Sequence, residues 1–201
     1  YLIDRMGRRP LLLVGMSGIA VSLLLCAYSF NQASYQLSAA EINSFENIDT
    51  YKLAEFQDVN YESDVAFKND IKLAIGNQVY ALNEGVILEA AIDMNATLVL
   101  IGILGFIACF AFSLGPVMWV MLSEIFPNRF RGLAIGVIGF INSFSSWLIQ
   151  QIFPWEISNL GSALTFFIYG LIATVGVLLF IKILPETKGK SLEEIESELI
   201  K

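Results

Sequence analysis

The chain has 201 residues, of which 56% are hydrophobic and only 15% are charged, and it contains 15 Phe but no His. A water-soluble domain of this size carries about a quarter charged residues, so the composition favours lipid as the main solvent. The sequence shows no nucleophile–base pair, no phosphate-binding loop and no metal-ligand cluster. These features argue against an enzyme, and we predict neither a metal nor another cofactor, and no nucleic-acid partner.

Four stretches are long and apolar enough to cross a hydrocarbon core of about 30 Å, which takes about 20 residues. Lys182, at the end of the last stretch, is the first Lys, Arg, Asp or Glu in any of them. The sequence therefore predicts an all-α membrane protein with these segments in chain order: a charged motif at 1–9, a span at 10–30, a long loop at 31–96, a span at 97–122, a short loop at 123–131, spans at 132–153 and 161–184, and a tail at 185–201.

The chain starts with Tyr1, and its first three residues are apolar. We interpret them as the end of a preceding helix, so we expect a fragment whose N-terminal helices are missing. In the predicted topology, in which successive spans cross the membrane in alternating directions, nine of the twelve Lys and Arg residues lie on the same side of the membrane. The positive-inside rule then places both ends of the chain in the cytoplasm and the loop 31–96 outside. We expect a multi-pass protein of the cell membrane, a bacterial inner membrane in particular.

The loop 31–96 is polar and acidic, with weak helical periodicity at 51–67 and 85–94. We expect the second of these segments to continue outward from the following span as one helix. A separate binding module in this loop is a weaker hypothesis, because the segment has low hydrophobicity and no recognisable motif.

Small residues follow one face of the first span at helical spacing, namely Gly15, Gly18 and Ser22. Small side chains allow membrane helices to approach closely, so this face is predicted to pack against a neighbour. The second span contains Gly115-Pro116, followed within one turn by Trp119. Proline removes a backbone N–H and breaks the helix, and such breaks in transporters often mark a substrate site or hinge.

The third span carries a polar stripe in which Asn142, Ser146 and Gln150 recur every four residues. An amide near the middle of a membrane span must face the bundle interior or a wet cavity. The amide of Asn142 offers both donors and an acceptor, which suits a neutral ligand rich in hydroxyl groups. An interhelical hydrogen bond without any ligand is the alternative interpretation.

Charged residues gather at the predicted cytoplasmic ends of the spans, where an ion-pair network is plausible between Glu124, Arg131, Arg8 and Arg9. Loosely solvated charges are the alternative, worth about 0–1 kcal/mol per pair. The tail begins a helix at Ser191 and Glu194, which form a capping box. We therefore predict a short amphipathic cytoplasmic helix there.

Four motifs now stand in order along the chain. They are Asp4-Arg5-Met6-Gly7-Arg8-Arg9, Gly115-Pro116-Val117-Met118-Trp119, Ser123-Glu124-Ile125-Phe126-Pro127 with Arg131-Gly132, and Pro185-Glu186-Thr187-Lys188-Gly189. Together they resemble the sugar porter family of the major facilitator superfamily, including its bacterial xylose, glucose and arabinose transporters. The resemblance covers the chain outside the loop 31–96, and it implies that the four spans correspond to helices 9–12 of a twelve-helix bundle.

The resemblance also implies roles for single residues. In relatives the tryptophan at the position of Trp119 packs under the sugar ring, an aromatic residue matching Phe110 lines the site, and an amide matching Asn142 bonds sugar hydroxyls. We add Gly115, Pro116 and Ser146 to this predicted substrate site from the helix break and the polar stripe. A second set of charges is similar to those that close the cytoplasmic face: Asp4, Arg8, Arg9, Glu124, Arg131 and Glu186.

Two features depart from the family pattern. Ser143 stands where relatives often have an aromatic residue, and the loop 31–96 is longer than in most relatives. The expected activity is movement of a hexose or pentose by alternating access, with the sugar, the bilayer and the missing N-terminal helices as partners. A polyol transporter and a non-transporting sugar sensor are the alternatives, although a sensor would usually have a longer tail. No carboxylate lies at mid-membrane in this chain, so proton symport and facilitated diffusion both stay open.

Overall fold

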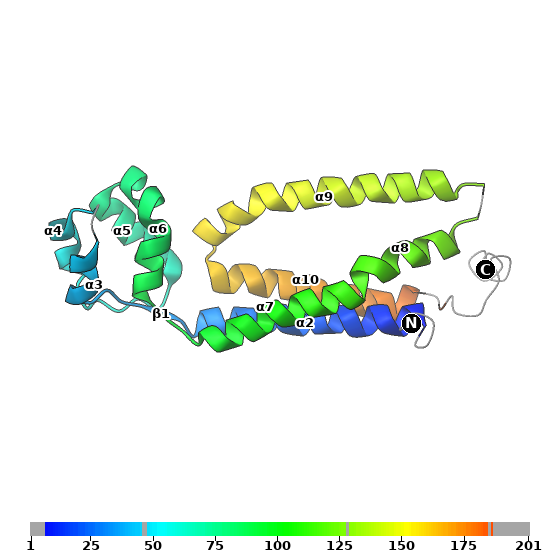
Figure 1. Ribbon diagram of the computed structural model, residues 1–201, viewed down its shortest axis with the longest axis horizontal. Coiled ribbons are helices and arrows are strands. Elements are labelled where there is room, and N and C mark those ends of the chain that lie inside the picture. The colour runs from blue at the N-terminus through cyan, green and yellow to red at the C-terminus, as the bar shows by residue number, and fades with distance from the viewer. Residues whose placement is uncertain (1–6, 46–47, 128, 185, 187–201) are drawn as a thin grey trace.

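The computed structural model describes residues 7–45, 48–127, 129–184 and 186. Long helices alternate in direction and lie side by side, and a group of short elements lies beyond one of their ends (Figure 1). In chain order the elements are α2 (Arg8–Asn31), β1 (Ser34–Tyr35), α3 (Ala39–Ser44), α4 (Thr50–Leu53), the 3-10 helix η1 (Ala54–Phe56), α5 (Asp64–Ile75), α6 (Asn77–Ala91), β2 (Ile92–Asp93), α7 (Ala96–Phe112), α8 (Leu114–Ile125), α9 (Arg131–Asn159) and α10 (Ser162–Ile183).

The predicted all-α membrane fold with four transmembrane helices is confirmed. Within the described residues, four helical segments are long and apolar enough to cross a membrane: α2, the consecutive pair α7–α8, α9 and α10. The helix α9 runs past the predicted end at 153 and contains Pro154. One proline frees a single carbonyl, so a helix can continue through it with a kink. The predicted tail helix with Ser191 and Glu194, and Asp4 in the first motif, lie outside the described residues.

The helix α2 packs between α7 and α10, and small residues make this packing close. A Cβ added at Gly15 would collide with the side chain of Ser113, and one added at Gly18 would collide with Sγ of Cys109. On the other side of α2, a Cβ added at Gly170 of α10 would lie 2.7 Å from Cδ2 of Leu24. Close approach of this kind takes the place of hydrophobic burial as the source of helix association in lipid.

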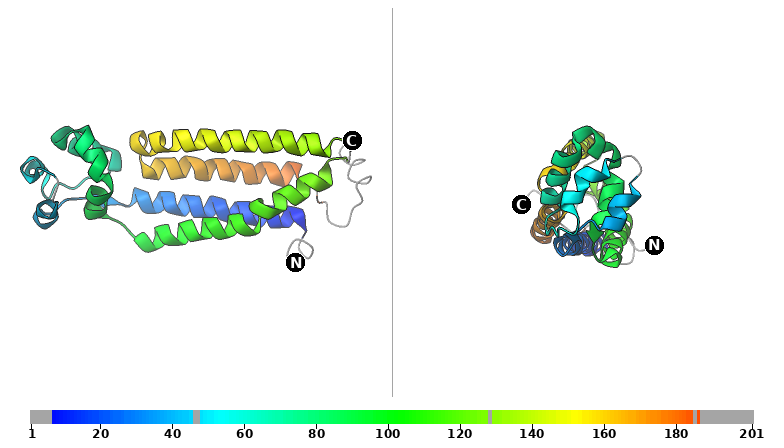
Figure 2. Two further views of the ribbon diagram at one scale, coloured as in Figure 1. Left: turned by 45° about the horizontal axis from the view of Figure 1, so that its top comes forward. Right: turned by 90° about the vertical axis from the view of Figure 1, so that its left-hand side faces the viewer.

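Residues 32–45 and 48–95 fold into a small helical unit, which we call the loop subdomain (Figure 2). The strands β1 and β2 pair antiparallel, Ser34 with Asp93 and Tyr35 with Ile92, and bring the two ends of the subdomain together. The subdomain has its own hydrophobic core, formed by the buried side chains of Ala33, Tyr35, Leu37, Ile42, Phe45, Ile48, Leu53, Phe67, Ile71, Ile75, Tyr80, Ile87 and Ala91.

The prediction that residues 85–94 extend the next span outward was wrong. The helix α6 ends at Ala91, the chain becomes extended over Ile92–Asp93, and α7 starts afresh at Ala96 with Asn95 as its N-cap. Ile87 and Ala91 are buried in the subdomain core, which holds α6 away from the axis of α7. Tertiary packing therefore overrides the continuous helical periodicity.

Candidate functional site

The second span is broken into α7 and α8 at Ser113, two residues before the predicted position at Gly115-Pro116. Pro116 occupies the third position of α8, where a missing N–H costs little. The proline ring clashes with the carbonyl of Phe112, which therefore cannot accept a helical hydrogen bond from residue 116. The helix is consequently distorted on the N-terminal side of the proline. The Oγ of Ser113 is buried and donates to the Cys109 carbonyl at 2.6 Å, which satisfies the last turn of α7.

The short helix α8 presents two different faces. Val117 and Met121 are buried against Leu11 and Leu12 of α2. Trp119 lies between them in sequence and therefore points away from α2. Its ring approaches α9, where a Cβ added at Gly139 would lie 3.8 Å from Cη2 of Trp119.

The other predicted substrate residues lie on the helices on either side of the contact between Trp119 and Gly139. Gly115 lies against Phe110, since a Cβ on Gly115 would be 3.6 Å from Cε1 of that ring. Asn142 and Ser146 are exposed on α9, and the Ser146 Oγ donates to the Asn142 carbonyl at 2.9 Å. The structure thus groups Phe110, Gly115, Pro116 and Trp119 at the helix break, with Asn142 one turn beyond Gly139 on the facing helix.

Four charged residues meet at the end of the bundle opposite the loop subdomain. We call Arg8, Arg9, Glu124 and Glu186 the gate cluster. Arg8 binds Glu124 through two nitrogens, with Nη2 to Oε1 at 2.7 Å and Nε to Oε2 at 3.1 Å. This two-pronged contact is the strong form of an ion pair, and it connects α2 to the end of α8.

Within the gate cluster, Glu186, three residues beyond the end of α10, caps α2, and Arg9 of α2 caps α10. The Glu186 carboxylate accepts the backbone N–H groups of Arg8 at 3.1 Å and Arg9 at 3.2 Å, the first two residues of α2. In return, Nη2 of Arg9 donates to the Ile181 carbonyl in the last turn of α10 at 2.7 Å. Negative charge at a helix N-terminus and positive charge at a helix C-terminus both interact favourably with the helix dipole and stabilise the helix. The predicted gate residue Arg131 makes no contact with this cluster among the described residues, and its Nε donates instead to the Phe126 carbonyl at 3.2 Å.

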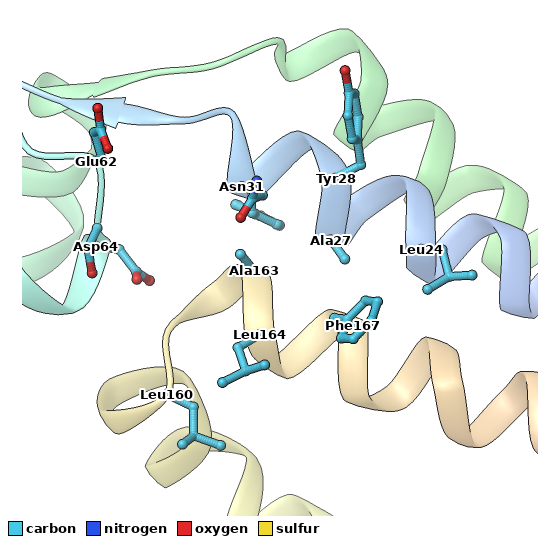
Figure 3. Close-up of a pocket in the computed structure, with 12 residues that line it drawn as sticks. Leu24, Ala27, Tyr28, Asn31, Glu62, Asp64, Leu160, Ala163, Leu164 and Phe167 are labelled. Carbon is cyan, nitrogen blue, oxygen red and sulfur yellow. The ribbon is translucent and has the colours of Figure 1, made fainter.

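A cavity of about 670 Å³ lies at the other end, between the loop subdomain and the ends of α2, α9 and α10 (Figure 3). One part of its wall is apolar, formed by Leu24, Ala27, Leu160, Ala163, Leu164 and Phe167. Another part is polar, formed by Tyr28, Asn31, Glu62, Ser63 and Asp64. None of the predicted substrate residues lines it.

Comparisons with known proteins identify the family of the chain. A family model described as "Sugar (and other) transporter" matches residues 73–199. The chain belongs to this sugar transporter family. It is 44% identical over 107 residues to an arabinose–proton symporter of Bacillus subtilis, covering 53% of this chain and 23% of the symporter. It is also 30% identical over 197 residues to a facilitated glucose transporter, member 10 of solute carrier family 2, of Danio rerio, covering 98% of this chain and 36% of that protein.

The structure of this sugar-transporter chain is similar to that of the proton:xylose symporter XylE of the major facilitator superfamily, solved with 6-bromo-6-deoxy-D-glucose. The TM-score is 0.58 at 27% identity, over 98% of this chain and 30% of XylE. The chain therefore spans about a quarter to a third of the length of these relatives. The expected membership of the sugar porter family in the major facilitator superfamily is confirmed.

Sequence reasoning missed the contact that joins the loop subdomain to this transporter fold. The carboxylate of Asp64 accepts the backbone N–H of Ser162 at 2.9 Å and its Oγ–H at 3.1 Å, and so caps α10. Lys68 is buried one turn later in α5, with Nζ at 3.5 Å from the same carboxylate oxygen. Ser63-Asp64 was recognisable as a helix start, but nothing local in the sequence pointed to a partner 98 residues away.

Proposed function

We propose that this chain is the C-terminal part of a secondary transporter that moves a monosaccharide, a hexose or a pentose, by alternating access. The supporting observation is the position of Trp119, on the face of α8 that points away from α2 and toward α9. Its ring offers an apolar surface for the CH face of a sugar, and its N–H offers one donor. The membership of the chain in the sugar transporter family agrees with this role.

The predicted substrate site combines this ring with polar groups of α9. Asn142 follows Gly139, the residue that Trp119 approaches, by nearly one turn. In the proposed site, the ring and the amide would therefore flank the bound sugar. The side-chain amide of Asn142 would donate to and accept from sugar hydroxyls. Phe110 and the broken backbone at Gly115-Pro116 would form the adjoining wall, and Ser146 the far edge of the polar stripe.

The gate cluster supports the alternating-access part of the proposal. Its ion pair and helix caps connect α2, α8 and α10 at one end of the bundle. Contacts of this kind are made in one conformation and lost in another, so they bias a two-state equilibrium. We propose that the cluster closes the cytoplasmic side, with Asp4 as a further member in the full-length protein.

Uptake by the full-length transporter in proteoliposomes tests the site. We expect Trp119→Ala and Asn142→Ala each to reduce labelled-sugar uptake at least about tenfold, as expected when about 1.4 kcal/mol of binding energy is lost. Trp155→Ala and Asn159→Ala are matched controls of the same residue types, near the far end of α9, and should keep uptake near the wild-type level. Normal uptake in both site variants would show the site to be wrong. Saturable binding without flux would instead favour a sugar sensor.

Labelling in intact cells tests the proposed orientation, with both ends of the chain in the cytoplasm. Glu89 is exposed on the loop subdomain, and Lys182 lies at the opposite end of the bundle. We expect a membrane-impermeant maleimide to label Glu89→Cys but not Lys182→Cys. The reverse pattern would contradict the orientation. Competition of uptake by arabinose, xylose, glucose and a polyol would then rank the substrates.

A further inference from the structure

The cavity beside the loop subdomain changes from apolar to polar along its length. Leu24 and Phe167 lie at its inner end, where α2 and α10 are within their membrane-spanning segments (Figure 3). Glu62 and Asp64 lie at its other end, beyond the last residue of α2, Asn31. The change in polarity therefore coincides with the ends of two membrane spans, where hydrocarbon gives way to headgroups and water.

We propose that this cavity binds one phospholipid whose headgroup carries a primary amine, of the phosphatidylethanolamine class. An acyl chain lies along α2 and α10, and the ammonium group binds at Glu62. The volume of about 670 Å³ falls within the range of roughly 300–1,000 Å³ typical of small-molecule sites. This site is separate from the predicted sugar site and from the gate cluster, and it goes beyond the proposed transport function.

The charges at the polar end select for a cation. Asp64 is already engaged by Ser162 and by the ammonium of Lys68. Glu62 makes no ion pair or hydrogen bond in the described part of the chain, and no Lys or Arg lines the cavity. Besides Glu62 and Asp64, the loop between residues 31 and 96 contains nine acidic residues, against three lysines that include Lys68. An anionic headgroup would be repelled here, whereas an ammonium group would complement Glu62.

A phosphate that carries this ammonium also finds neutral donors. The side-chain amide of Asn31, the last residue of α2, and the hydroxyl of Ser63 line the polar part of the cavity. These groups donate hydrogen bonds to phosphate oxygens without adding positive charge. A zwitterionic lipid is therefore favoured over one with net negative charge, and a primary amine, which donates N–H bonds to a carboxylate, over a quaternary one.

The walls of the cavity are held in place before any ligand binds. The bonds from Ser162 to Asp64 fix the segment 62–64 against the start of α10. Gly161 has φ of +85°, and a Cβ there would collide with Asp64, so the approach requires glycine. On the inner side, Leu24 packs against Gly170. Preorganised walls reduce the entropy lost when a ligand binds.

Native mass spectrometry of the full-length protein tests the proposal. The protein is released from nanodiscs with equal amounts of ethanolamine, N-methylated ethanolamine, choline and glycerol phospholipids of identical acyl chains. We expect the ethanolamine lipid to be retained about two- to fivefold over the glycerol lipid, the range for one partly exposed ion pair, and retention to fall with each added methyl group.

Three variants separate the two halves of the site. Glu62→Gln should remove the preference for the ethanolamine lipid, whereas Glu89→Gln, on an exposed position of α6, should keep it. Ala163→Trp fills the apolar end and should lower retention of all four lipids. Preference for the glycerol lipid, equal retention of the choline lipid, or an unchanged preference in Glu62→Gln would each overturn the proposal. The readout involves no sugar, so failure of the transport proposal would not affect it.

Discussion

Arg8 and Glu124 are 116 positions apart in the sequence, and their side chains form a two-pronged ion pair with a shortest distance of 2.7 Å. The pair connects the first turn of α2 to the last turn of α8. Because α8 is separated from α7 at Ser113, its end is held by this pair and by Val117 and Met121, which pack against α2. The ion pair therefore helps to fix the position of α8, the short helix that also carries Trp119.

We expect Arg8 and Glu124 to be energetically coupled. Arg8→Ala and Glu124→Ala should each destabilise the full-length protein, and the double variant should be less damaging than their sum by about 1 kcal/mol. Denaturant unfolding in detergent measures this difference. Raising the salt concentration should reduce it only in part, because both side chains are largely shielded, 16% and 26% exposed. Strict additivity would show that the contact contributes no stability.

The carboxylate of Glu186 caps the N-terminus of α2, so its removal should affect that helix first. Glu186→Gln keeps the shape but loses the charge, and we expect it to cost about 0.5–1 kcal/mol. Hydrogen exchange of the backbone N–H groups of Arg8 and Arg9 should accelerate. Glu55→Gln, on an exposed position of the loop subdomain, is the control. Unchanged exchange at α2 would contradict the capping role.

Gly15→Ala and Gly85→Ala should have opposite effects. Both glycines lie in helix interiors, where alanine is favoured by roughly 1 kcal/mol. At Gly85 the added Cβ meets nothing within 4 Å, so we expect a small gain in stability. At Gly15 it would collide with Ser113, at the break between α7 and α8, and we expect a loss of about 1–3 kcal/mol from overpacking. Thermal unfolding of the two variants, measured side by side, would refute the close packing if both were stabilised.

The bond between Asp64 and Ser162 should hold the loop subdomain on the transmembrane helices. Asp64→Asn removes the charge that compensates the buried ammonium of Lys68, so we expect it to cost about 1–3 kcal/mol. Hydrogen exchange should rise in α5 and in the first turn of α10 together. The variant Asp64→Asn with Lys68→Met removes the uncompensated charge and should recover part of the stability. A rise confined to α5 would contradict the cap on α10.

The loop subdomain should lose stability in strong alkali. Burial raises the pKa of Tyr35 from 10.0 to about 12, and the charge of Asp64 contributes. Burial also raises the pKa of Tyr61 to about 12, with a further contribution from its hydrogen bond to Asp70. The unfolded chain ionises first, so stability is complete below pH 10 and is lost as the pH rises through about 12. Tyr61→Phe should show a weaker loss in thermal unfolding between pH 9 and pH 11.5, and an equal loss would refute the assignment.

The sequence by itself determined the membrane class, the four spans and the sugar transporter family. Length and apolarity are local properties, since about 20 uninterrupted apolar residues suffice to specify a span whatever surrounds them. The motif around Pro116 likewise predicted a broken helix, because a missing N–H acts within one turn. The prediction that Gly15 and Gly18 allow close packing was also sound, although their partners, Ser113 and Cys109, could not be named.

Only the tertiary structure decided which distant groups meet. The helix α6 ends at Ala91 because its apolar residues are buried in the core of the loop subdomain. The caps formed by Glu186 on α2 and by Asp64 on α10 join residues 178 and 98 positions apart. A carboxylate carries no local signal of the helix it will cap, since that pairing depends on how the whole chain packs.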